Sequence, residues 1–87
     1  MEVNKEKILQ TVIEKIKNEY KNLYITYDYL DYSNVYEIWY DKKELKNDKK
    51  FQDFIGFLIK KYLFSNKIYN IYFDYNEEKT KALKLTK

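Results

Sequence analysis

Residues 24–41 read YITYDYLDYSNVYEIWYD, and this stretch decides the fold. Tyr, Ile, Val and Trp are frequent on both sides of its centre, and side chains alternate along it with a period of two. The tetrapeptide DYSN at 31–34 separates the two halves and has the composition of a turn. The stretch therefore predicts a β-hairpin with strands at 24–30 and 35–41.

Helical patterns flank this hairpin on both sides. Upstream, Asn4 is suited to an N-cap, and the apolar period predicts a helix over about 4–20. Its apolar face consists of Leu9, Val12, Ile13, Ile16 and Tyr20. Downstream, a polar loop at 42–47 leads to Asp48, which can cap a second helix that reaches residue 64. The apolar face of this helix consists of Phe51, Phe54, Ile55, Leu58, Tyr62 and Leu63.

The remaining sequence adds one strand. Asn66 is suited to the left-handed position that ends a helix, and IYNIYFDY at 68–75 predicts a third strand. The order α-β-β-α-β predicts an α+β domain with two layers, in which both helices pack on one face of an antiparallel sheet ordered 2-1-3. We expect one domain at 1–78 and a basic tail at 79–87. In one interpretation residues 83–85 of the tail form a fourth strand, and in another the tail is mobile.

The amino-acid composition is strongly biased towards a few residue types. All 17 basic residues are Lys, and Lys, Asn, Ile and Tyr make up 45 of the 87 residues. These four amino acids have AT-rich codons, which indicates an AT-rich genome. There is no Cys, no apolar run that could span a membrane and no apolar segment at the N-terminus. We therefore expect a protein of the bacterial cytoplasm without a membrane partner.

Most catalytic chemistries lack their residues in this chain. The absence of His and Cys removes the commonest general base and the commonest soft metal ligand, and a single Gly excludes a Gly-rich phosphate loop. Carboxylates remain, and Asp28, Asp41 and Asp74 are a candidate set for Mg²⁺ or Ca²⁺. We favour solvated acids over a metal site. The sequence thus predicts no enzymatic activity, no cofactor and no metal.

The alternation of the strands divides their side chains into two sets. One set carries no charge and is assigned to the core beneath the helices: Ile25, Tyr27, Tyr29, Tyr36, Ile38, Tyr40, Ile71, Phe73 and Tyr75. The opposite set combines carboxylates with large aromatic rings. From it we take the candidate partner-binding residues, which are Tyr24, Asp28, Glu37, Trp39, Asp41, Tyr72 and Asp74. Rigid rings would anchor a partner, and the carboxylates would attract a basic one.

Charge is strongly segregated along the chain. Residues 24–41 have a net charge of −4 and residues 68–78 of −3, whereas residues 42–67 have +5 and residues 79–87 have +4. The overall charge of +3 therefore hides a bipolar molecule. A second hypothesis follows, in which the basic second helix and tail bind nucleic acid. Its candidate residues are Lys49, Lys50, Lys60, Lys61, Lys79, Lys81 and Lys84.

Two further features bear on self-association. The sheet face and the edge strands could pair with a second copy of the chain, which makes a homodimeric structural protein the third hypothesis. Phe57 and Phe64 lie off the apolar stripe of the second helix. We expect them to pack against the first helix, and the alternative is an exposed patch used for self-association.

The segments YKNLYITYDY, VYEIWYD, FQDFIGFLIKKYLF and IYNIYFDY resemble small accessory proteins carried by phages and other mobile elements of AT-rich, low-GC bacteria. The resemblance implies a non-catalytic inhibitor of bacterial defence, of which anti-CRISPR proteins are the familiar example. Such inhibitors cover the nucleic-acid-binding site of an effector nuclease. Our leading hypothesis is accordingly a protein-binding module whose acidic–aromatic sheet face docks a basic, nucleic-acid-handling host enzyme.

Overall fold

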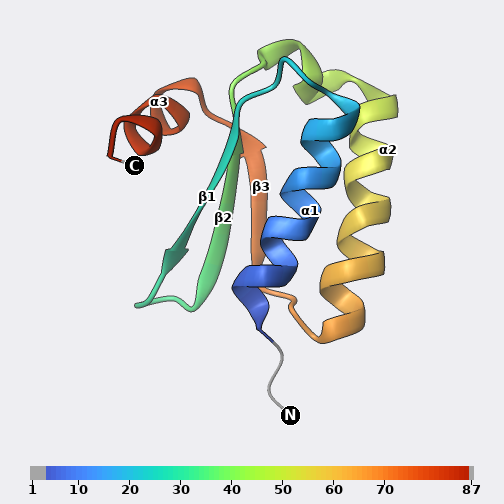
Figure 1. Cartoon of the computed structure of the whole chain (residues 1–87), viewed down its shortest axis with the longest axis vertical. Coiled ribbons are helices and arrows are strands. Elements are labelled where there is room, and N and C mark those ends of the chain that lie inside the picture. The colour runs from blue at the N-terminus through green and yellow to red at the C-terminus, as the bar shows by residue number, and fades with distance from the viewer. Residues whose placement is uncertain (1–3, 87) are drawn as a thin grey trace.

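A computed structural model describes residues 4–86 of the chain and the side chains of residues 4–81. In chain order its elements are α1 (Lys5–Glu19), β1 (Ile25–Leu30), β2 (Val35–Tyr40), the 3₁₀ helix η1 (Lys43–Asn47), α2 (Lys49–Leu58), the π-helical turn η2 (Ile59–Leu63), the 3₁₀ turn η3 (Phe64–Asn66), β3 (Ile71–Tyr75) and α3 (Glu77–Thr86). In Figure 1, α1 and α2 lie side by side on one side of the sheet, and α3 lies on the other. The predicted α+β class with a three-stranded sheet is confirmed.

Side-chain caps fix where the first two helices begin. Asn4 Oδ1 accepts a hydrogen bond from the Lys7 amide, and Asp48 Oδ1 accepts one from the Phe51 amide, each over 3.1 Å. Both predicted N-caps are therefore confirmed.

A π-helical turn changes how the second helix ends. The Phe64 amide donates to the carbonyl of Ile59, five residues earlier, so the turn holds one more residue than an α-helical turn. The extra residue shifts the apolar register. Leu63 takes the core position, Tyr62 is only partly buried and Phe64 is exposed to solvent.

The left-handed residue that follows this helix is Lys67, with φ of 61°, and the prediction of Asn66 is wrong by one position. Asn66 remains in the last turn because its side-chain amide donates to the Tyr62 carbonyl over 2.7 Å.

The sheet is mixed, with the order β1-β2-β3. β1 pairs antiparallel with β2, and β2 pairs parallel with β3. The predicted antiparallel order 2-1-3 is wrong, because alternation determines which face a side chain takes but not which strand lies beside it. The parallel placement stacks Phe73 on Tyr40, with ring centroids 5.4 Å apart, and brings Tyr72 to 5.3 Å from Trp39.

The register confirms the predicted division of the strands into two faces. Ile25, Ile38 and Tyr40 are buried on the inner face, and most of the other predicted core residues of the strands pack partly buried around them. Tyr29 is the exception, since it is exposed near the hairpin turn. The inner face and the two helices thus enclose a continuous apolar core, whose burial is the main source of stability.

The third helix covers part of the outer face. α3 contacts β1 and β2 on the side of the sheet away from α1 and α2 (Figure 1). The interpretation of residues 83–85 as a strand is wrong, because Asn76 caps a helix there: its Oδ1 accepts from the Lys79 amide over 2.9 Å. Glu77 and Glu78 also favour a helix, since acidic side chains in the first turn interact well with its dipole.

Candidate functional site

The outer face of the sheet brings together five of the seven predicted binding residues. Asp28, Glu37 and Tyr72 lie opposite one another on β1, β2 and β3, and we call them the acidic row. Trp39 and Asp74 belong to the neighbouring row on the same face. Asp28 and Glu37 are directly opposed carboxylates on adjacent strands, an arrangement that is unfavourable unless a cation lies nearby.

Trp39 is not the exposed aromatic anchor that the sequence predicted. Only 7% of its surface is exposed, because the Tyr72 ring and Lys79 from α3 cover it. The Lys79 ammonium lies 5.2 Å from the centre of the Trp39 ring, within the range of a cation–π interaction. The buried indole N–H of Trp39 has no hydrogen-bond partner in the part of the chain that the structure describes.

Glu37 holds the same lysine as an ion pair. Lys79 Nζ lies 3.0 Å from Glu37 Oε1, and the Glu37 side chain is only 16% exposed. The chain itself thus places an ammonium group between a carboxylate and an aromatic ring of the outer face. This contact shows what kind of group the surface accommodates, namely a cationic side chain.

Asp74 is satisfied by neighbouring groups of the chain. Its Oδ1 accepts from the Tyr75 amide over 2.7 Å and lies 3.9 Å from Lys46 Nζ. Its Oδ2 accepts from the Tyr72 hydroxyl over 3.2 Å. The negative charge of Asp74, followed by this hydrogen bond, raises the pKa of Tyr72 above its ordinary value.

Among the described side chains, Asp28 takes part in no ion pair, whereas Glu37 and Asp74 each do. Asp28 Oδ1 accepts from the backbone amide of Tyr29 over 2.9 Å. The partly exposed Asp28 and the half-exposed Tyr72 form the two ends of the acidic row.

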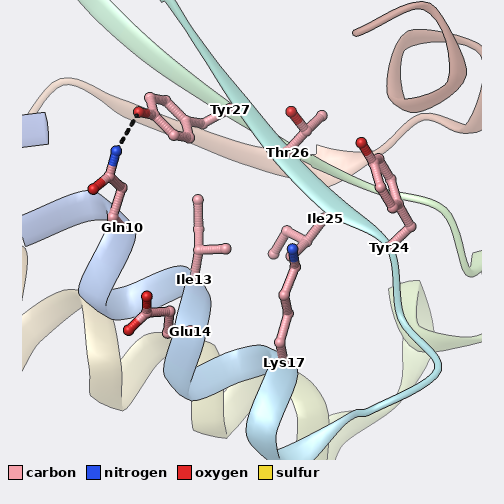
Figure 2. A pocket seen from close by; sticks show the side chains of 8 residues that line it. All are labelled: Gln10, Ile13, Glu14, Lys17, Tyr24, Ile25, Thr26 and Tyr27. Atoms are coloured by element: carbon pink, nitrogen blue, oxygen red, sulfur yellow. Dashed lines mark hydrogen bonds between the residues drawn. The ribbon is translucent and has the colours of Figure 1, made fainter. Parts of the chain in front are cut away.

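Tyr24 and Asp41 lie apart from the row, at the end of the hairpin away from its turn. Asp41 Oδ1 accepts from the Tyr24 amide over 3.0 Å, and the Asp41 amide donates to the Tyr24 carbonyl over 3.2 Å. Asp41 therefore extends the pairing of β1 with β2, which is a structural role. The Tyr24 ring lines a groove of about 290 Å³ between α1 and β1 (Figure 2).

This groove has an apolar wall formed by Ile13 and Ile25, and Gln10 donates to the Tyr27 hydroxyl across it over 3.4 Å (Figure 2). Its charged lining groups are Glu14 and Lys17. Across the described residues, no three acidic side chains converge as a metal site would require. Within residues 4–86, no helix has the length and apolar character needed to cross a membrane.

The lysines of the nucleic-acid hypothesis are distributed over two sides of the molecule. Lys49, Lys50, Lys60 and Lys61 belong to α2 and η2, whereas Lys79 and Lys81 belong to α3 across the sheet (Figure 1). Lys49 is paired with Asp53 over 2.7 Å and Lys81 with Glu77 over 3.2 Å. The Lys84 side chain lies outside the described residues. These lysines do not form one surface.

Three aromatic rings are exposed, of which Phe57 and Phe64 agree with the alternative of an exposed patch, whereas Tyr69 was not singled out from the sequence. Phe57 is 56% exposed, Phe64 is 40% exposed and Tyr69 is 64% exposed. The expectation that Phe57 and Phe64 pack against the first helix is wrong, because both point away from the core. Their position off the apolar stripe was the sequence signal for this exposure.

Comparison of the chain with protein-family models, curated proteins and solved structures gives no match.

Proposed function

We propose that this protein is a non-catalytic binding module that docks a lysine- or arginine-rich segment of a partner protein on the outer face of its sheet. The acidic row carries the proposal. Its two carboxylates oppose each other, and of the two only Glu37 is ion-paired among the described residues. Lys79 offsets the charge of Glu37, and a cation supplied by a partner would offset the charge of Asp28 in the same way.

Lys79 supports the proposal by showing how such a cation is held. It combines an ion pair to Glu37 with a contact to an aromatic ring. Tyr72, which is 48% exposed, offers a second ring at the other end of the row from Asp28. Because adjacent strands lie about 4.8 Å apart, the row is roughly 10 Å wide and has room for more than one cationic side chain.

The partner class that fits best is an enzyme that handles nucleic acid. Such enzymes expose lysines and arginines that bind phosphates, and the carboxylates of the acidic row would occupy those groups in place of phosphate. The protein would then inhibit its partner by competition, as the resemblance to phage accessory proteins implies. Binding through exposed charges weakens as salt rises.

A labelled oligolysine peptide tests the surface directly. Asp28→Asn removes the charge but keeps an oxygen that can accept from the Tyr29 amide, so the fold should be unaffected. We expect its affinity for the peptide to fall about two- to five-fold, the worth of one exposed charge contact.

Glu14→Gln is the matched control, because it makes the same change in net charge at an exposed position on α1. It should bind the peptide like the wild type. Equal losses in Asp28→Asn and Glu14→Gln would show that only overall charge matters and would contradict the proposal.

The inhibitory role needs a separate experiment. An enzyme captured from nuclease-treated bacterial lysate by the wild type but not by Asp28→Lys should lose its binding to nucleic acid when the wild-type chain is added. An enzyme that binds the chain and nucleic acid together would contradict inhibition by competition.

A further inference from the structure

The outer flank of α2 carries a second surface, of opposite charge to the acidic row. Its exposed rings are Phe57, Phe64 and Tyr69, and exposed lysines stand among them at Lys60, Lys61 and Lys67. We call these six residues the basic–aromatic flank. It lies on the side of the sheet that α1 and α2 cover, whereas the acidic row lies on the side of α3 (Figure 1).

The rings and lysines of this flank are interleaved. Phe57 and Phe64 are both exposed, and they lie on either side of the π-helical turn η2. Lys61 lies between them, with its ammonium 5.5 Å from the Phe57 ring centre. The Phe64 ring lies 5.5 Å from the Tyr69 ring, which extends the aromatic surface beyond the helix.

The π-helical turn helps to create this surface. Because η2 holds one extra residue, Leu63 fills the core position and the next residue, Phe64, is placed on the outer side. Exposing three large rings is unfavourable unless they are covered by a ligand.

The positive charge of the basic–aromatic flank is not balanced by acidic residues of the same segment of the chain. No Asp or Glu occurs between Asp53 and Asp74, while that stretch contains three lysines. Lys15 from α1 adds a further ammonium, 5.4 Å from the centre of the neighbouring Tyr62 ring. The ligand of this surface should therefore be anionic and should present flat or apolar groups to the rings.

We infer that the basic–aromatic flank binds single-stranded nucleic acid. Lysines that contact phosphates and rings that stack on unpaired bases are the two components of such sites. An acidic protein partner fits less well, since it would pair with the lysines without needing flat groups to stack on the rings. This surface is independent of the acidic row, so the two proposals can fail separately.

The test is fluorescence anisotropy with a labelled oligodeoxythymidylate of about 12 nucleotides, a length within the range of known single-strand sites. The double variant Phe57→Ala/Phe64→Ala leaves the net charge unchanged and alters only exposed rings. Its affinity should fall at least about five-fold for each ring that stacks on a base.

The lysines are tested by the salt dependence of the same binding. Lys60→Gln/Lys61→Gln should weaken binding and make the slope of log affinity against log salt shallower by about 1.4, the value for two lost phosphate contacts on a single strand. Lys49→Gln/Lys50→Gln is the matched control, with the same charge change in the first turn of α2. Asp28→Asn should bind the oligonucleotide at least as well as the wild type.

Three results would overturn the inference. One is an equal loss in Lys49→Gln/Lys50→Gln and Lys60→Gln/Lys61→Gln. Another is full affinity in Phe57→Ala/Phe64→Ala when circular dichroism shows an intact fold. The third is a lack of binding to the oligonucleotide while vesicles of phosphatidylserine or an acidic peptide bind the flank.

Discussion

At the scale of single residues, Gly56 is the one glycine of the chain and lies inside α2. It has an ordinary negative φ, and a Cβ built there would meet no heavy atom within 4 Å. Glycine inside a helix is unfavourable because the unfolded chain has more conformational freedom. Gly56→Ala should therefore raise the free energy of unfolding by about 0.5–1 kcal/mol, measured by urea denaturation. A lower stability would contradict the described geometry of α2.

Tyr40 is expected to make the free energy of unfolding depend on pH in the alkaline range. Burial raises its pKa above the ordinary value of 10.0, and the charge of Asp74 adds to this while Gln52 opposes it. The folded state therefore keeps the phenol proton more tightly than the unfolded state. The stabilisation is complete below about pH 10 and is lost as the pH rises through the folded pKa.

Tyr40→Phe keeps the ring that packs against Phe51 and Phe73. Above pH 10, the midpoint temperature of thermal unfolding should fall less steeply with rising pH in this variant than in the wild type. Curves with the same slope would show that the Tyr40 hydroxyl does not contribute to the pH dependence.

At the scale of secondary structure, α3 is held to the outer face by Lys79. Lys79→Gln removes the ion pair to Glu37 and the contact with the Trp39 ring. Because Trp39 is the single tryptophan, the tryptophan emission of the protein comes from this site. We expect a red-shifted emission and a stability loss of at most about 1 kcal/mol, since Lys79 is partly exposed.

Lys81→Gln is the control for this prediction. Lys81 pairs with Glu77 inside α3 and does not take part in the Glu37 ion pair. Its substitution should leave the emission of Trp39 unchanged. The same red shift in both variants would mean that α3 responds to its overall charge rather than to the Lys79 contact.

The strands and the first two helices were predictable because their patterns are local. Period-two alternation located the hairpin, and Asn4 and Asp48 marked where helices begin. The same logic was available for α3, since Asn76 followed by Glu77 and Glu78 is an N-cap with an acidic first turn. The many lysines after residue 78 favoured the interpretation of this segment as a tail and not as a helix. The π-helical turn was not predictable, because it depends on which residue packs in the core.

At the scale of the whole molecule, strand order and surface exposure depend on long-range packing. The alternation placed Asp28, Glu37, Trp39, Tyr72 and Asp74 on one face, as the register confirms. It did not reveal that α3 covers Trp39, or that β3 lies beside β2. The candidate site was thus predictable as a set of residues but not as an accessible surface.

The two charged surfaces lie on opposite sides of the molecule. The acidic row faces the side of α3, and the basic–aromatic flank lies on α2 and the turns that follow it (Figure 1). The separation of charge in space is partial, because Lys79 and Lys81 of α3 lie on the same side as the acidic row (Figure 1). The separate positions of the two surfaces predict that Asp28→Asn weakens binding of the basic peptide but not of the oligonucleotide, and that Lys60→Gln/Lys61→Gln weakens binding of the oligonucleotide but not of the peptide.

Binding of cationic segments to the acidic row can be followed by amide chemical shifts during titration with the oligolysine peptide. We expect the largest shift changes at Asp28, Glu37 and Tyr72, with little change in α2. Changes centred on another part of the chain, or spread evenly over all acidic residues, would contradict the proposal.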